Sequence, residues 1–89
     1  MIFDSNEAKK QTNTVFSKNF DHIIECISNL IKEASNCGYS QLKLEWISIN
    51  GYMVEYNRIG DDNLKLIADE FKKAGYSFDL FFNYAMITW

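Results

Sequence analysis

The sequence predicts an α+β fold in one domain spanning residues 1–89: a long N-terminal helix, a β-hairpin, a second helix and a C-terminal β-hairpin. Three observations lead to this expectation. Apolar residues recur at three- and four-residue spacing in two segments, which is the period of a helix. Apolar and polar residues alternate in two other segments, which is the period of a strand. The element order favours an antiparallel sheet with the helices on one face.

Residues 5–37 are expected to form the first helix, with Ser5 as its N-cap and Gly38 ending it in the left-handed conformation. One side of the segment carries an apolar stripe and the opposite side carries charged residues, so the stripe should face the core. The position of Asn19 leaves two alternatives open, one continuous helix or a short helix followed by a longer one. The stripe comprises Ala8, Thr12, Val15, Phe16, Phe20, Ile23, Ile24, Ile27, Leu30, Ile31 and Ala34.

Residues 39–59 are expected to form the first hairpin. Asn50-Gly51 is a strong hairpin signal, because a type I′ turn needs positive φ at both of its central positions. The alternation before Trp46 is out of phase with the pairing that this turn imposes, so we expect a β-bulge near Trp46 that turns its side chain outward. The expected cross-strand pairs are Ile49 with Tyr52, Ile47 with Val54 and Glu45 with Tyr56.

Residues 62–74 are expected to form the second helix, which Gly75 ends. Asp61 or Asp62 caps it, and both carboxylates suit the positive end of the helix dipole. Its apolar stripe consists of Leu64, Ile67, Ala68 and Phe71.

Residues 76–89 alternate and turn near Asn83, which predicts the second hairpin. The segments Gly38-Tyr39-Ser40 and Gly75-Tyr76-Ser77 each join a predicted helix to a predicted strand. They indicate either convergent capping by glycine or an αββ-αββ pseudo-repeat forming one four-stranded antiparallel sheet.

Composition argues against several classes of function. The formal net charge is −3 with both signs spread along the chain, whereas binding to duplex nucleic acid needs clustered lysine and arginine. One histidine, His22, and the distant cysteines Cys26 and Cys37 do not supply a set of convergent metal ligands. No phosphate-binding loop or nucleophile-elbow motif occurs. We therefore expect no metal, no cofactor and no enzymatic activity.

The cysteines and the apolar runs also predict where the protein works. Cys26 and Cys37 fall in one predicted helix, about 16 Å apart, which is too far for a disulfide. Reduced thiols indicate a reducing compartment. No apolar run approaches about 18 residues and no secretion signal is evident, so we expect a cytoplasmic protein that makes no membrane contact.

Aromatic residues concentrate on the first predicted hairpin, where Trp46, Tyr52 and Tyr56 are followed by Arg58. Tryptophan, tyrosine and arginine are the usual anchors of binding surfaces, and they also stack on nucleotides. The alternative is that these aromatics pack the small core, while Phe81, Phe82 and Trp89 serve as core or dimer contacts. Nearby acidic residues complete the candidate surface. The candidate partner-binding residues are Trp46, Tyr52, Glu55, Tyr56, Arg58, Asp61 and Asp62.

Several short motifs together resemble small phage-encoded proteins of Gram-positive hosts. A segment from Ala8 to Thr12 begins a helix that closes on Ala34 and Gly38, a second helix closes on Ala74-Gly75-Tyr76, and the last strand is Tyr84–Trp89, with its Ile-Thr-Trp end. The resemblance implies an accessory protein that binds host machinery or host defence proteins stoichiometrically, and it carries over no functional residue.

The leading hypothesis is therefore a non-enzymatic phage inhibitor that binds a host protein, such as a CRISPR nuclease, in the host cytoplasm. One alternative is a dimeric sponge that sequesters a nucleotide signal in a pocket lined by tyrosine and Arg58. Another is a virion or assembly component held together by edge strands and Trp89.

Overall fold

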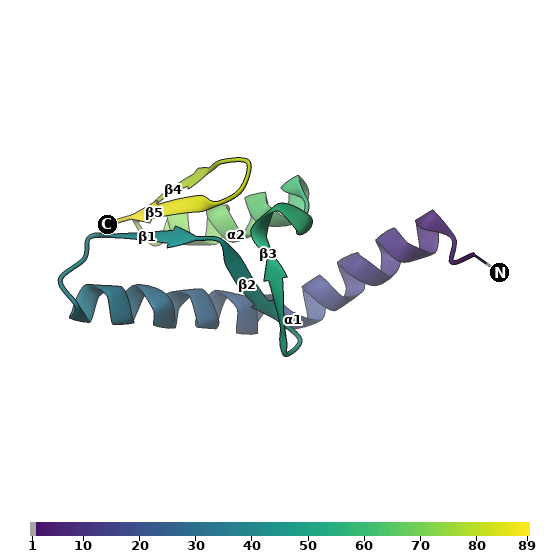
Figure 1. Ribbon diagram of the computed structural model, residues 1–89, viewed down its shortest axis with the longest axis horizontal. Helices are drawn as coiled ribbons and strands as arrows, with labels where there is room; N and C mark the ends of the chain where they lie inside the picture. Colours follow the sequence, from purple (N-terminus) through teal and green to yellow (C-terminus); the bar gives the residue numbers. More distant parts are fainter. Residues whose placement is uncertain (1) are drawn as a thin grey trace.

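The computed structural model describes residues 2–89 and confirms the α+β class (Figure 1). All strand pairs are antiparallel, but they form two sheets, so the expectation of a single sheet was wrong. One sheet has three strands in the order β1-β5-β4, and the other is the two-stranded β2-β3 hairpin. In chain order the elements are α1 (Ser5–Asn36), β1 (Gln41–Leu44), β2 (Trp46–Ile49), β3 (Tyr52–Glu55), the 3-10 helix η1 (Tyr56–Arg58), α2 (Asp61–Lys73), β4 (Ser77–Leu80) and β5 (Ala85–Thr88).

The division into two sheets resolves the change of phase near Trp46. Leu44 and Ile47 are both buried although they are three residues apart, and a continuous strand would point them to opposite faces. The chain ends β1 at Leu44, exposes both Glu45 and Trp46, and begins β2 in a different sheet. The expected β-bulge is therefore replaced by a strand break, while the outward position of Trp46 is confirmed.

The β2-β3 hairpin has the predicted turn and register. Asn50 and Gly51 adopt φ values of 52° and 84°, as a type I′ turn requires. Beyond the two strands, the Tyr56 N–H donates to the Glu45 carbonyl oxygen at 2.9 Å, which continues the same register. The pairs are Trp46–Glu55, Ile47–Val54, Ser48–Met53 and Ile49–Tyr52.

Both α-helices end in the same hydrogen-bonded motif. Gly38 and Gly75 have φ values of 86° and 98°, a region that costs a side-chain-bearing residue energy. The N–H groups of Tyr39 and Tyr76 donate to carbonyl oxygens five residues earlier, at 3.0 and 3.1 Å. This 6→1 bond is the mark of a Schellman cap, so the capping role of the two Gly-Tyr-Ser segments is confirmed.

The first strands after the two helices, β1 after α1 and β4 after α2, lie on either side of the central strand β5. Leu42 on β1 and Phe78 on β4 both lie opposite Ile87 on β5, so β1 and β4 have matching registers on either side of it. Only the helix and the first strand repeat in this way. The second strands differ, because β2 pairs with β3 while β5 pairs with both β1 and β4. The four-stranded αββ-αββ sheet is therefore not formed.

The helices begin at caps other than those predicted. The Asp4 side chain is the N-cap of α1 and accepts a hydrogen bond from the Asn6 N–H at 2.9 Å, so Ser5 is the first helical residue. Gly60 occupies the cap position of α2 without a side-chain hydrogen bond, and Asp61 and Asp62 lie in the first turn. Their carboxylates still face the positive end of the helix dipole.

Helix α1 is continuous through Asn19, whose side-chain amide donates to the Val15 carbonyl oxygen at 2.9 Å. Figure 1 shows that its first turns lead away from the other elements, and the whole molecule has extents of 52 × 23 × 21 Å. The first buried residue of the helix is Phe16. Residues 5–15, which we call the α1 arm, therefore lie outside the core.

The core lies between the helices and one face of each sheet. Helix α1 packs against β1 and β2, and α2 packs against β4. Both helices cover the same face of the three-stranded sheet, as predicted, because the row Leu42, Phe78 and Ile87 points inward. The buried side chains are Phe16, Ile23, Ile27, Ile31, Leu44, Ile47, Tyr56, Ile59, Leu64, Ile67, Ala68, Phe71, Phe78, Ala85 and Ile87.

Candidate functional site

The β2-β3 hairpin separates two of the predicted binding residues. Trp46 lies opposite Glu55 on the outer face of the hairpin. Tyr52 lies opposite Ile49, and because side chains alternate along a strand, this pair belongs to the other face. Trp46 is 47% exposed and Tyr52 is 72% exposed. Both are accessible, but they form parts of two different surfaces.

Tyr56 is in the core and not on a binding surface, which corrects its assignment as a partner-binding residue. The side chain is only 1% exposed and belongs to the buried core. Its hydroxyl has no hydrogen-bond partner among the described residues. Burial raises the pKa of Tyr56, as does the negative charge of Asp61. The nearby Phe81 backbone acts in the opposite direction and lowers the pKa, although it does not form a hydrogen bond with the Tyr56 hydroxyl.

The raised pKa predicts a loss of stability in alkaline solution. The folded protein holds the Tyr56 proton more tightly than the unfolded chain does. The contribution of protonated Tyr56 to the free energy of unfolding is therefore complete below the ordinary tyrosine pKa of about 10 and is lost as the pH rises above it. We expect the urea midpoint of the wild type to fall more steeply between about pH 9 and about pH 11 than that of Tyr56→Phe. Parallel curves for the two proteins would contradict this expectation.

Arg58 and the two aspartates lie beside the hairpin. The Arg58 Nε atom is 3.7 Å from the Glu55 Oε1 atom, and both side chains are well exposed. Asp61 and Asp62 are exposed and line a shallow cavity of about 530 Å³ between the start of α2 and the α1 arm. The structure thus joins Trp46, Glu55 and Arg58 along the outer face of the hairpin and places the aspartates at a separate cavity.

Sequence reasoning missed a chain of contacts that extends the outer face of the hairpin. Lys43 on β1 places its Nζ atom 3.2 Å from the Glu45 Oε1 atom and 4.7 Å from the centre of the Tyr84 ring. Tyr84 in turn stacks on Phe81, with ring centres 4.8 Å apart. Glu45 is exposed and directly precedes the exposed Trp46, the first residue of the hairpin. Phe81 and Tyr84 lie in the loop between β4 and β5. The turn signal at Asn83 predicted this loop, but no sequence pattern linked it to Lys43.

We call this surface the aromatic outer face. Its apolar groups are well exposed, as Met53 at 65% and Phe81 at 50% show. Exposed aromatic and methionine side chains surrounded by charged groups are typical of surfaces that bind other proteins. Phe81, expected to be a core or dimer contact, therefore lies outside the core. The aromatic outer face consists of Lys43, Glu45, Trp46, Met53, Glu55, Arg58, Phe81 and Tyr84.

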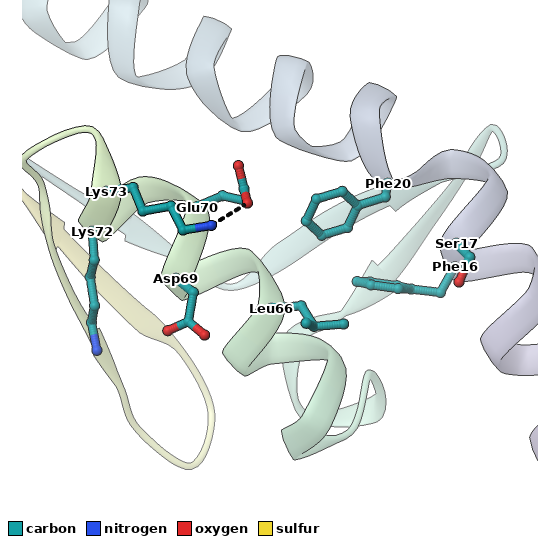
Figure 2. A pocket seen from close by; sticks show the side chains of 8 residues that line it. All are labelled: Phe16, Ser17, Phe20, Leu66, Asp69, Glu70, Lys72 and Lys73. Atoms are coloured by element: carbon teal, nitrogen blue, oxygen red, sulfur yellow. Dashed lines mark hydrogen bonds and ion pairs between the residues drawn. The ribbon is translucent and has the colours of Figure 1, made fainter.

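A second hollow, of about 770 Å³, lies between the two helices (Figure 2). Phe16 and Phe20 of α1 and Leu66 of α2 point toward one another across it, and the two phenyl ring centres are 5.7 Å apart. Charged residues of both signs border it on α2, where Lys73 Nζ lies 3.3 Å from Glu70 Oε1. The remaining lining residues are Ser17, Asp69 and Lys72.

The only histidine lies close to a cysteine on α1. The His22 Nε2 atom is 3.6 Å from the Cys26 Sγ atom, as their four-residue spacing on a helix predicts. Cys26 and Cys37 are both free thiols. Within residues 2–89, no group of three or more histidine, cysteine or acidic side chains is arranged to hold a metal ion. None of the described helices has the length and apolarity needed to cross a membrane.

Comparison with models of protein families, with curated proteins and with solved structures found no match.

Proposed function

We propose that this protein is a phage-encoded inhibitor that binds a host protein through the aromatic outer face. The observation that carries the proposal is the cluster of exposed apolar side chains on that face, centred on Trp46 and Met53. Removing such groups from water on binding stabilises a complex, and tryptophan is the residue most enriched among those that dominate binding energy. The ion pairs around them supply a polar rim.

The charge of the surface supports a protein partner over a nucleic acid. The two basic side chains of the aromatic outer face, Lys43 and Arg58, each lie beside a glutamate, so the face offers no free cationic patch to phosphates. The chain as a whole carries a net charge of −3. A nuclease that binds nucleic acid presents basic surfaces, to which an acidic inhibitor is attracted over long range. A defence nuclease is therefore the partner class that we propose.

The two other hypotheses have less support. A nucleotide sponge needs a cationic pocket. Among the described residues, the cavity of about 360 Å³ between the α1 arm and the hairpin has Arg58 as its one basic lining residue. Arg58 also lies beside Glu55, which offsets its charge. An assembly role would use edge strands and Trp89. The Trp89 ring packs against Tyr76 within the chain and is 38% exposed, so only part of it is accessible to another copy. Both hypotheses predict results different from ours in the experiment below.

Capture of the tagged full-length chain from bacteria with native defence systems tests the proposal. The eluate is analysed by mass spectrometry for proteins and nucleotides. We expect one host protein in stoichiometric amount. A nucleotide without a protein would replace the proposal with the sponge, and large regular assemblies of the chain alone would replace it with the assembly role.

Trp46→Ala is expected to weaken binding to the captured partner by at least about 2 kcal/mol, or about 30-fold in Kd. The reason is that Trp46 is the largest apolar group on the aromatic outer face, and its exposure means that the fold tolerates its removal. Tyr39→Ala is the matched control, since Tyr39 is an exposed aromatic at the far end of β1. Titration calorimetry measures both, with circular dichroism confirming the fold. Equal affinity of the two variants would show that binding uses another surface.

A further inference from the structure

His22 and Cys26 place two metal-ligating side chains together on α1, away from the surfaces described above. Their four-residue spacing brings both side chains to one side of the helix, and the His22 Nε2 atom lies 3.6 Å from the Cys26 Sγ atom. His22 is exposed, and Cys26 is half-buried and a free thiol. An ion in solution can therefore reach both side chains.

The distance between these two atoms is the one that a tetrahedral zinc ion requires of two of its ligands. Zinc binds cysteine sulfur at about 2.3 Å and histidine nitrogen at about 2.0–2.1 Å, with tetrahedral angles between them. These lengths place the sulfur and the nitrogen about 3.6 Å apart. The same separation is already present between His22 and Cys26, so one ion can contact both atoms without a change in the helix.

The chemistry of the two groups also suits zinc. In the metal-free chain the Cys26 thiol can donate to Nε2 of His22 when the other ring nitrogen, Nδ1, carries the proton. A zinc ion takes the place of that thiol proton, which passes to solvent as the S–Zn bond forms, and it uses the same Nε2 lone pair. Thiolate and imidazole favour zinc over Mg²⁺ and Ca²⁺, which prefer oxygen ligands.

We propose that His22 and Cys26 bind one zinc ion per chain, with Nε2 and the thiolate as its two protein ligands. The ligand count in the sequence argued against a metal, because zinc sites usually use three or four protein ligands. Within residues 2–89 no third histidine, cysteine or acidic side chain joins the pair, so water fills the remaining positions. The bound ion links two successive turns of α1. The site is independent of the proposed function, because neither residue belongs to the aromatic outer face.

Cobalt(II) is the probe that tests this site, because a cobalt–thiolate bond gives a near-ultraviolet charge-transfer band that hydrated cobalt lacks. The full-length protein is purified without a polyhistidine tag and kept reduced with a phosphine, so that no added imidazole or thiol competes. We expect the band to saturate at one cobalt per chain. Zinc should abolish it, since zinc binds such ligands more tightly than cobalt does, and excess Mg²⁺ should leave it unchanged.

Substitutions on α1 show which side chains hold the ion. His22→Ala and Cys26→Ser are each expected to weaken cobalt binding more than about 100-fold, since loss of even an outer partner of a metal ligand costs about 10–100-fold. Cys37→Ser removes the other free thiol and is the matched control, which should bind as the wild type does. Cys26→Ser/Asn29→Cys keeps one histidine and two cysteines but sets His22 and the nearer thiol about 10.5 Å apart along the helix, so it should bind as weakly as Cys26→Ser.

Urea unfolding gives a second readout that does not depend on the spectrum. Zinc should raise the midpoint of the wild type and of Cys37→Ser, because it binds the preformed pair more tightly than the unfolded chain, and it should leave His22→Ala and Cys26→Ser unchanged. Circular dichroism without metal checks that both variants fold. A wild type without the charge-transfer band, or a band that persists in His22→Ala or in the shifted-cysteine variant, would overturn the proposal. Saturation at half a cobalt per chain would overturn the single-chain site and assign the ion to two chains.

Discussion

Phe71→Ala is expected to lower the free energy of unfolding by about 3–5 kcal/mol. Phe71 is 4% exposed and lies where α2 meets β4, with ring-centre distances of 5.8 Å to Tyr76 and 5.7 Å to Phe78. Its removal leaves a cavity that this small core has little means of filling. A domain of this size has a total stability on the order of 5–10 kcal/mol, so the variant should be close to unfolding at ambient temperature.

Urea unfolding followed by circular dichroism measures this loss. Leu66→Ala is the matched control, because Leu66 lies on the same helix but is 52% exposed in the groove between α1 and α2. We expect the control to cost less than about 1 kcal/mol, as surface substitutions usually do. Similar losses for the two variants would mean that α2 does not pack against β4 as described.

Tyr56 is expected to respond in opposite directions to two substitutions. Tyr56→Ala should cost about 3–5 kcal/mol, because a ring buried to 1% exposure is replaced by a cavity. Tyr56→Phe keeps the ring and removes a hydroxyl that has no hydrogen-bond partner among the described residues. Burying an unpaired hydroxyl costs about 1–3 kcal/mol, so Tyr56→Phe should leave stability unchanged or raise it.

The same urea assay separates these effects, and it determines how binding data should be interpreted. Loss of partner binding in Tyr56→Ala would follow from unfolding, whereas Tyr56→Phe should bind its partner as the wild type does. A destabilised Tyr56→Phe would show that the hydroxyl makes a stabilising hydrogen bond. Trp46→Ala, by contrast, should lose binding while it keeps the wild-type urea midpoint.

Much of the local structure follows from the sequence alone, because its signals come from residues close together in the chain. Asn50-Gly51 specifies the type I′ turn and with it the register of β2 and β3. Gly38 and Gly75 end the two helices in left-handed conformations that other residues adopt only at a cost. The apolar stripes contain the core residues of both helices, since helical periodicity is a local property. The α1 stripe was too long, however, because Thr12 and Leu30 are exposed and the stripe residues before Phe16 lie outside the core.

The tertiary structure alone decided which strands meet and which aromatics are exposed. Pairing of β1 with β5 joins residues more than 40 positions apart, and no local pattern distinguishes this from a continuous four-stranded sheet. The strand break at Glu45 follows from the need to bury both Leu44 and Ile47, and it leaves Trp46 outside while Tyr56 lies in the core. Burial depends on what packs against a residue, whereas a sequence pattern shows only its neighbours along the chain.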